Sequence, residues 1–459
     1  MKPPATPPDF DGLLASLREN ELERFVQVFS ANPQEPKDEY LHWDKLRFKK
    51  PPEGFTSEEW WLRIKLSRRS IAREIEPLHT KTGDPFWYCL PDVLLKSVDA
   101  IARKASGDIA ISEQVTSAHT RDTYIVSSLI EEAITSSQLE GAVTSRQVAK
   151  EMIRSGRSPK DRSERMILNN YRAMQLVSDL RSTDLTPELV CEIHRVVTDG
   201  TLDNPEAAGK LQTVDSDRVA VWSEADDEIL HQPPPAEELA ERLARLCEFA
   251  NDRETGPYMP PVLRAITLHF MFGYDHYFED GNGRTARAIF YWSMLRQGYW
   301  LAEFITISRI LKKAPVKYAR AYLLTESDDG DLTYFLVYNL GVIERAIDDL
   351  HAHLEKKAAE LRDAQDRLKA LPGEFNYRQL ALLEKALKDP SSAFTAVSHA
   401  NSHNVSTETA RTDLTALEKR GFLMQQRVKR RFVWIPAPDL RSHLPSAEAS
   451  DPLLLGERL

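Results

Sequence analysis

The stretch HYFEDGNGRTAR, residues 276–287, places a histidine, two acids, two glycines and two arginines within one short segment. Gly281 and Gly283 flank Asn282, and glycine permits a tight turn with positive φ angles that other residues adopt only at a cost. The residues after the turn, TARAIFYWSML, carry apolar side chains at helical spacing. The turn therefore leads into a helix N-terminus, where the backbone N–H groups of residues 281–283 form a cradle for an anion.

The charged side chains of the same stretch suit a di- or triphosphate. Arg284 and Arg287 are three residues apart, so they are neighbours on the first helical turn. Asp280 offers hard oxygen ligands that can hold Mg²⁺ against the phosphates. His276 can act as a base near neutral pH, and Phe278 is expected to be an apolar peg that fixes the loop.

With these residues in place, the stretch resembles the signature of the Fic family, His-x-Phe-x-(Asp/Glu)-Gly-Asn-Gly-Arg-x-x-Arg. Every fixed position is filled, and the helical segment PPVLRAITLHFMFGYD before it is also similar to the family. The second position is commonly proline in the family, whereas this chain has Tyr277. We expect that change to alter the geometry slightly and to leave the chemistry intact.

The resemblance implies transfer of AMP from ATP to the hydroxyl of a protein Ser, Thr or Tyr, with release of pyrophosphate. His276 would take the proton of the hydroxyl, and Mg²⁺ on Asp280 would bridge the α- and β-phosphates. Asn282 and the backbone of residues 281–283 would steady the α-phosphoryl group. Arg284 and Arg287 would hold the β- and γ-phosphates. ATP and Mg²⁺ are therefore the expected substrate and cofactor.

A second motif, SSQLEG at residues 136–141, matches the inhibitory pattern of the family, (Ser/Thr)-x-x-x-Glu-(Gly/Asn), through Ser136, Glu140 and Gly141. It ends a helix expected at about residues 121–141. The Glu140 carboxylate can pair with Arg287, the guanidinium otherwise meant for the γ-phosphate. The sequence therefore predicts an enzyme that inhibits itself until this pair is broken.

The expected fold is mainly α: a helical Fic fold with a small β-hairpin flap and a C-terminal winged helix-turn-helix domain. The flap falls between Gly209 and the prolines at 233–235. The family often has an arginine shortly after that glycine, whereas this chain has Lys210 and Gln212. The domains are expected at 1–110 (helical extension), 111–350 (Fic domain), 351–372 (helical linker), 373–436 (winged helix) and 437–459 (loose tail).

The winged helix is expected because residues 373–436 read as three helices followed by the alternating stretch FLMQQRVKRRFVWI. Residues 373–435 hold ten Lys or Arg against six Asp or Glu, which makes the segment basic within an acidic protein of net charge −10. Side chains that could reach DNA are Thr409, Arg411, Thr412, Thr415, Arg427, Lys429, Arg430 and Arg431. The alternative for this segment is an interaction or dimerisation module.

Composition agrees with an ordinary globular protein, at 42% hydrophobic and 28% charged residues. The N-terminus lacks the apolar run of a signal peptide, no stretch reaches the length of a membrane span, and three scattered cysteines indicate a reducing compartment. We therefore expect a cytoplasmic protein without a membrane partner. The candidate partners are a protein with a hydroxyl side chain, the chain itself, a second copy in a homodimer, and DNA through residues 373–436.

Two other functions stay open at this stage. Glu140 could orient water and support hydrolytic removal of AMP from a modified protein at the same site. The chain could also be a nucleotide-sensing transcription regulator that binds DNA, although a pure receptor has no need for a base at His276.

Overall fold

The structure is a computed structural model that describes residues 2–20, 22–30, 39–106, 118–214, 218, 221–222, 229–252, 256–369, 375–390, 392–428, 431–440 and 442–444. The chain divides into two compact units. The first comprises Met1–Ile109 with Ile125–Asp349, and the second comprises Ala110–Tyr124 with Leu350–Leu459. The finer division at residues 110, 350, 372 and 436 stays a prediction.

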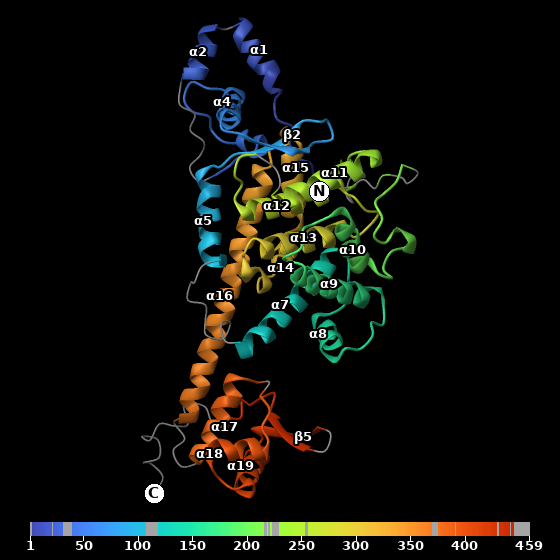
Figure 1. The fold of residues 1–459 in the computed structure, drawn as a ribbon. Coiled ribbons are helices and arrows are strands. Elements are labelled where there is room, and N and C mark those ends of the chain that lie inside the picture. The colour runs from blue at the N-terminus through green and yellow to red at the C-terminus, as the bar shows by residue number, and fades with distance from the viewer. Residues whose placement is uncertain are drawn as a thin grey trace. The chain divides into compact units, whose positions relative to one another are not determined.

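Helices dominate both units, which confirms the mainly α fold class (Figure 1). The helices before residue 300 are α1 (Phe10–Asn20), α2 (Leu22–Ser30), α3 (Trp43–Leu46), α4 (Ser57–Ser70), α5 (Asp92–Ser106), α7 (Ala118–Leu139), α8 (Arg146–Ser155), α9 (Arg162–Asp179), α10 (Pro187–Thr198), η1 (Pro205–Ala207), η2 (Ala236–Glu238), α11 (Leu239–Ala250), α12 (Pro261–Asp275) and α13 (Asn282–Arg296). Those that follow are η3 (Trp300–Glu303), α14 (Ile307–Lys313), α15 (Pro315–Glu326), α16 (Thr333–Lys369), α17 (Tyr377–Lys388), α18 (Ala396–His403) and α19 (Thr407–Lys419).

The described strands form three antiparallel pairs: β1 (Arg73–His79) with β2 (Pro85–Tyr88), β3 (Val221–Trp222) with β4 (Ile229–His231), and β5 (Leu423–Val428) with β6 (Arg431–Pro436). The second pair is the expected small hairpin. The first pair is an addition to the expected helical extension. Pro77 within β1 weakened the strand signal there, since proline cannot donate to a ladder.

Helices α12 and α13 form the centre of the first unit (Figure 1). Nearly every residue of α12 is buried, and so is most of α13, because α9, α10 and α11 pack against this pair. A helix that is apolar all round must be surrounded by protein. The turn between the two helices is thereby fixed to the most rigid part of the unit, and it carries residues 276–281.

Helix α7 is equally well anchored. Ile130, Ala133 and Ile134 lie on its buried face and pack in one cluster with Met152 of α8 and Ile167 of α9. The helix ends at Leu139, and Gly141 follows with a φ of 90°. This left-handed residue is the expected helix terminator, since glycine takes that conformation without strain.

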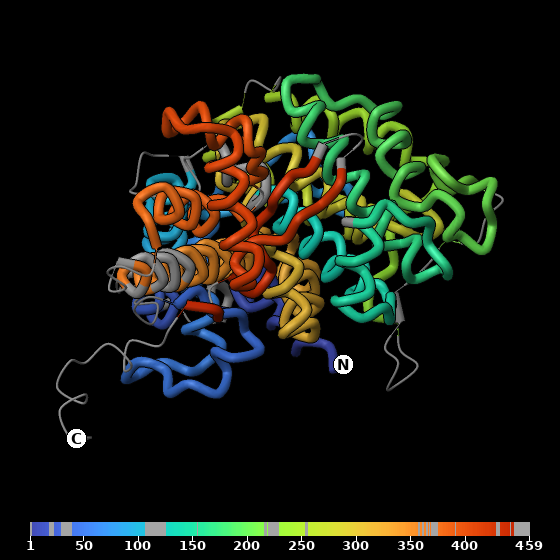
Figure 2. Tube along the Cα trace, turned by 90° about the horizontal axis from the view of Figure 1, so that it is seen from below, coloured from blue at the N-terminus to red at the C-terminus, as the bar shows by residue number. Residues whose placement is uncertain are grey.

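In the second unit, α17, α18 and α19 are followed by the β5–β6 hairpin, the order expected from the sequence (Figure 2). The buried Asp413 carboxylate of α19 joins the three helices. It accepts hydrogen bonds from Asn376 and Arg378 at the start of α17, at 2.8 and 2.7 Å, and lies 3.3 Å from Nε2 of His399 in α18. One of the ten basic residues of this segment, Arg378, thus stabilises the fold.

The prediction of a loose tail at residues 437–459 is wrong for the first part of that segment. Leu440 and Leu444 are buried in the core of the second unit together with Phe422 and Trp434. Burial of these two leucines removes their apolar surface from water and stabilises the contact. Residues 437–440 and 442–444 therefore belong to the second unit. Residues 445–459 lie outside the described residues, as do the predicted boundary at 372–373 and two predicted wing residues, Lys429 and Arg430.

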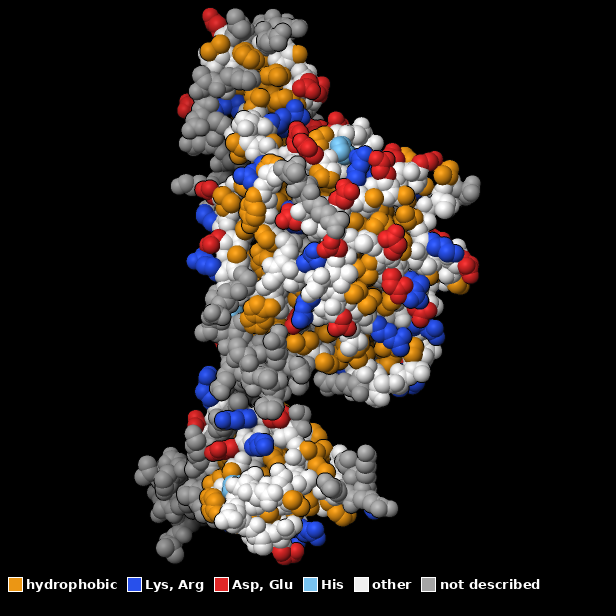
Figure 3. All heavy atoms as spheres, viewed as in Figure 1, with side chains coloured by type: hydrophobic (Ala, Val, Ile, Leu, Met, Phe, Trp, Pro, Cys, Tyr) orange, Lys and Arg blue, Asp and Glu red, His pale blue; other side chains and the backbone are white. Residues whose placement is uncertain are grey.

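The face of the first unit seen in Figure 3 mixes acidic and basic side chains without a large block of one sign. Among the helices that the structure describes, none combines the length and the apolar character needed to cross a membrane.

Candidate functional site

The turn between α12 and α13 has the predicted backbone. His276 closes α12 with a φ of 51°, and Gly281 precedes α13 with a φ of 86°. Glycine is required at position 281 both for this positive φ and because a Cβ there would come too close to Thr198 of α10. No side chain among the described residues caps α13. Its first N–H groups are therefore oriented as an anion cradle.

The interior of the turn is held by Phe278 and Asn282. Phe278 is fully buried and stacks on the ring of His194, with the ring centroids 3.7 Å apart, so it is the expected apolar peg. The Asn282 amide accepts from the Phe278 N–H at 3.0 Å and donates to the Phe278 carbonyl at 2.7 Å. The Asn282 side chain thus shapes the loop, and its backbone is the part left for a ligand.

His276 is suited to accept a proton. Its Nδ1 lies 3.4 Å from the Gly273 carbonyl, an arrangement that places the ring proton on Nδ1 and leaves a lone pair on Nε2. Burial lowers the pKa of His276 to about 4. The imidazole is therefore uncharged at neutral pH, the form in which it can act as a base.

Both predicted arginines are buried in the first two turns of α13. Arg284 donates from Nη1 to the Val197 carbonyl at 3.2 Å, and its Nε has no hydrogen-bond partner among the described residues. Asp280 is half exposed, with Oδ2 lying 3.7 Å from Nη2 of Arg284 and 4.0 Å from Nη2 of Arg162. A buried guanidinium with an unused N–H donor suits an anionic ligand.

Arg287 is already occupied by the C-terminal end of α7. Its Nη2 donates to Oε1 of Glu140 at 2.7 Å, and its Nε donates to Oγ of Ser136 at 2.8 Å. Burial works to raise the pKa of Glu140, but the Arg287 guanidinium outweighs burial and holds that pKa below its ordinary value. Gly283 permits the approach, because a Cβ there would lie 3.0 Å from the Glu140 carboxyl carbon. The structure thus brings together the two predicted motifs.

A cavity of about 290 Å³ adjoins these groups. Glu140, His276 and Arg287 lie in its wall with the backbone turn of α13. The remaining wall comes from the hairpin, α12 and α15, and it is mostly apolar and aromatic. Its lining residues are Leu230, His231, Gly273, Tyr318, Ala319, Tyr322, Leu323 and Glu326, while α13 contributes Asn282, Gly283 and Ala286. A cavity with charged groups at one place and apolar walls elsewhere suits a phosphate-bearing ligand with a flat apolar part.

Residues 184–294 match the family model described as the Fic/DOC family. The match includes the whole turn from His276 to Arg287. This part of the chain is a Fic domain. Ser136 and Glu140 lie before the matched residues, so their contacts with Arg287 join the Fic domain to a helix outside the match.

Two curated relatives carry similar segments. The protein named protein adenylyltransferase fic-1 of Caenorhabditis briggsae is 36% identical over 110 residues, which cover 24% of this chain and 19% of the relative. Protein adenylyltransferase Fic of Nematostella vectensis is 25% identical over 192 residues, which cover 40% of each chain. The chain thus spans less than half the length of both relatives.

Among solved structures, a Fic family protein from Desulfovibrio desulfuricans G20 is 16% identical with a TM-score of 0.47, over 75% of this chain and 95% of that chain. Fic-1 from C. elegans is 20% identical with a TM-score of 0.46, over 66% of this chain and 79% of that chain. Scores of this size carry no argument about the site.

Three residues of the Fic domain hold the turn in place, and none of them was predicted from the sequence to have this role. Arg218 donates to the carbonyls of Asp275 and His276 at 2.6 and 2.9 Å. Gln212 donates through its backbone N–H to the Tyr277 carbonyl at 3.0 Å and through its side chain to the Phe278 carbonyl at 2.7 Å. His194 lies 2.8 Å from the Asp280 carbonyl. No local sequence pattern indicates these contacts, because the three residues lie about 60 to 90 positions from the carbonyls that they contact.

The hairpin is tied to the cavity by His231 of β4. Its Nδ1 lies 2.7 Å from Oε2 of Glu326 in α15, and its Nε2 lies 2.7 Å from the Tyr274 carbonyl. Both ring nitrogens thus face oxygen atoms. The contact fixes the hairpin of the Fic domain beside this cavity, where the sequence predicts the flap.

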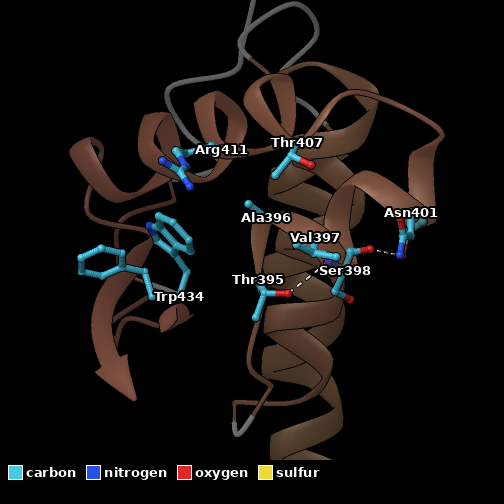
Figure 4. Close-up of a pocket in the computed structure, with 10 residues that line it drawn as sticks. Thr395, Ala396, Val397, Ser398, Asn401, Thr407, Arg411 and Trp434 are labelled. Atoms are coloured by element: carbon cyan, nitrogen blue, oxygen red, sulfur yellow. Dashed lines mark hydrogen bonds between the residues drawn. The ribbon is translucent and has the colours of Figure 1, made fainter. Parts of the chain in front are cut away.

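The second unit has a groove of its own, of about 850 Å³ (Figure 4). Arg411 and Thr407 of α19 line one side, and the Arg411 side chain extends toward Trp434 of β6. The opposite side is formed mainly by α18 and the residue before it. These lining residues are Thr395, Ala396, Val397, Ser398, Asn401 and Ser402. The groove is therefore rich in hydroxyl and amide groups, with one exposed cation.

Proposed function

We propose that the chain transfers AMP from ATP to the hydroxyl of a protein Ser, Thr or Tyr, including its own. The observation that carries this proposal is the uncapped N-terminus of α13 with two buried arginines, placed beside a neutral His276 at one cavity. The match to the Fic/DOC family and the printed names of the two curated relatives support the same reaction.

In this proposal, Nε2 of His276 accepts the hydroxyl proton while the hydroxyl oxygen forms a bond to the α-phosphorus. The bond between the α-phosphorus and the bridging oxygen breaks, and pyrophosphate leaves. The backbone N–H groups of Asn282 and Gly283 stabilise charge on the α-phosphoryl group, joined by that of Gly281 once it leaves Oδ1 of Asp280, to which it donates at 2.5 Å in this structure. Arg284 and Arg287 bind the other phosphates. The chain's contribution is therefore positioning and charge stabilisation.

Mg²⁺ fits Asp280 only in company with the nucleotide. The Asp280 carboxylate is half exposed at the edge of the turn, so it can present oxygen ligands to a hard cation. Among the described residues, no group of three or more His, Cys, Asp or Glu side chains is placed to hold a metal ion. Phosphate oxygens and water would complete the coordination, and the ion would neutralise charge on the phosphates.

The structure corresponds, in this proposal, to a self-inhibited state. Glu140 occupies Arg287, and its carboxylate would lie near the γ-phosphate of a bound ATP. A productive nucleotide must then break an ion pair and tolerate an unfavourable like charge. Because Glu140 follows the last residue of the well-packed α7, relief of inhibition needs only a change at the helix end.

Labelled ATP tests the reaction class. If AMP is transferred, label at the α-phosphate stays with the protein after denaturation and label at the γ-phosphate is lost with pyrophosphate. Retention of the γ label with loss of the α label would instead identify a kinase and reject the proposal.

We also propose that the second unit binds duplex DNA through the groove between α18, α19 and β6. Hydroxyl, amide and arginine side chains are the groups that contact phosphates and base edges. The supporting observation is that Arg411, Thr407 and Ser398 are exposed there. Thr412 is exposed as well, whereas Thr409 and Thr415 are half-buried.

Arg411→Ala should weaken binding of the whole chain to a labelled duplex. Loss of one phosphate contact lowers the slope of log affinity against log salt by about 1. Fluorescence anisotropy at several salt concentrations measures this slope. Lys385→Ala on α17 removes an exposed cation outside the groove and should leave the slope unchanged. If the parent does not bind duplex DNA at low salt, the groove serves a protein partner instead.

A further inference from the structure

The residue before His276 is a buried carboxylate with two partners. Asp275 is fully buried at the end of α12. Its Oδ1 accepts from Nε of Arg242 in α11 at 2.8 Å, and its Oδ2 accepts from the Tyr277 hydroxyl at 2.6 Å. Arg242 also donates to the carbonyl of His79 at the end of β1. The three side chains form a continuous network on both sides of His276 in the sequence.

The Tyr277 ring is tightly packed, in addition to the hydrogen bond of its hydroxyl. The side chain is fully buried, and the ring lies edge-on to Phe272, with the centroids 5.3 Å apart. Because the ring fits among aromatic neighbours, a phenylalanine can occupy the same volume. The hydroxyl can therefore be removed without opening a cavity, which separates its role from the packing of the ring.

The backbone beside this network is held at four successive carbonyls. Arg218 binds the carbonyls of residues 275 and 276, and Gln212 binds those of residues 276, 277 and 278. His276 itself has a φ of 51°, a left-handed conformation that histidine rarely adopts. A strained backbone of this kind persists only where its surroundings determine it strongly.

We propose that the Tyr277 hydroxyl, through Asp275 and Arg242, positions the imidazole of His276 for proton transfer. This inference rests on the proposed function, because it assigns His276 the role of base. Tyr277 is a positioning residue that contacts neither nucleotide phosphates nor the reacting hydroxyl. Its hydroxyl joins the residue after His276 to the residue before it, so it restrains the backbone on both sides of the imidazole.

The network acts on the proton-transfer step and leaves the phosphate-binding groups alone. The arginines and most of the N–H groups that would bind ATP belong to α13, whereas Tyr277, Asp275 and Arg242 lie outside that helix, in the turn, α12 and α11. Loss of the Tyr277 hydroxyl should therefore lower kcat and leave the KM for ATP nearly unchanged. Misplacement of a catalytic group by a fraction of an ångström to one ångström costs about ten- to a hundredfold in rate.

Tyr277→Phe should also change the pH dependence of kcat. Burial raises the pKa of the Asp275 carboxyl, and Arg242 and the Tyr277 hydroxyl act against that rise. Removing the hydroxyl makes the pKa of Asp275 higher still, so the carboxyl becomes protonated at a higher pH. The acidic limb of the kcat profile should therefore move to higher pH in Tyr277→Phe.

A shift of the acidic limb can be assigned to the lost hydroxyl only if the other ionisable groups that face Asp275 stay in place. They are His231 of β4, Tyr274 of α12 and Arg218 beside the hairpin. Tyr277→Phe leaves all three in place. A shift in the acidic limb then reports the loss of the hydroxyl from the carboxylate.

The test compares kcat and the KM for ATP in Tyr277→Phe and the parent, both in a Glu140→Gly background of the whole chain. Tyr88→Phe is the matched control, since Tyr88 is a buried tyrosine of β2 outside the network. Asp275→Asn should lower kcat in the same direction, and the double variant should lose less than the product of the two effects. Backbone amide exchange of residues 276–278 should be faster in Tyr277→Phe.

Each outcome decides the inference. A lower kcat with an unchanged KM, faster amide exchange of the turn and a shifted acidic limb support it. Parental kcat in Tyr277→Phe, or an effect confined to KM, overturns it. If the Glu140→Gly background transfers no AMP at all, the proposed function fails. The amide exchange then still tests whether the hydroxyl holds the turn, and unchanged exchange would overturn the positioning role.

Discussion

Glu140→Gly should raise self-modification by ATP at least about tenfold. The substitution removes the carboxylate that pairs with Arg287 at 2.7 Å and frees the guanidinium for the γ-phosphate. A differential binding energy of about 1.4 kcal/mol is enough for a tenfold change in rate, and loss of a buried charge pair supplies energy of that order. The helix should survive, because Glu140 lies beyond the last residue of α7. AMP incorporation at matched ATP concentrations measures the gain.

Two companion variants identify the cause of that gain. Arg287→Ala in the Glu140→Gly background should abolish it, since the same guanidinium serves the inhibitor and the substrate. Glu131→Ala removes another glutamate of α7, one that pairs with Arg146 at 2.7 Å and does not contact Arg287. Incorporation by Glu131→Ala should stay at the parental rate. Parental incorporation in Glu140→Gly would reject self-inhibition by this residue.

His276→Ala should remove transfer while leaving ATP binding nearly intact. The imidazole donates no hydrogen bond to the phosphate-binding groups of α13, and its loss deletes the base. General base catalysis contributes about a hundredfold to ten-thousandfold in rate, so activity should fall by at least two orders of magnitude. Rates and calorimetric ATP affinities are compared in the Glu140→Gly background, where Arg287 is free.

A second histidine controls for that substitution. His443 lies in the C-terminal unit and contacts Asp439 at 2.8 Å, so His443→Ala should keep the transfer rate. Equal transfer by His276→Ala and its parent would remove the base assignment. Loss of ATP binding along with transfer would instead make His276 a structural residue of the turn.

The sequence predicted the turn well because its determinants are local. Gly281 before Asn282, followed at once by apolar residues at helical spacing, specifies a left-handed residue at the start of a helix. The contact between Glu140 and Arg287 joins residues 147 positions apart, so no spacing rule could supply it. That contact was expected from the family pattern at residues 136–141 and is present in the structure.

The contacts that fix the turn from outside could not be predicted in this way. Arg218 and Gln212 bind the backbone of residues 275–278, and backbone carbonyls leave no trace in a sequence. In the sequence, Gln212 stands out only as a departure from the family near the flap. Tyr277 was expected only to alter the geometry slightly. Its hydroxyl bonds to Asp275 two positions away, and Arg242 reaches the same carboxylate from α11, 33 positions away.

Mass spectrometry of the 459-residue Glu140→Gly chain after incubation with ATP and Mg²⁺ tests the central claim most directly. The account predicts an AMP adduct on a Ser, Thr or Tyr hydroxyl, and no adduct when His276→Ala is added. A phosphoryl adduct in its place would contradict adenylyl transfer. So would an unmodified chain that binds ATP and transfers AMP to no added protein.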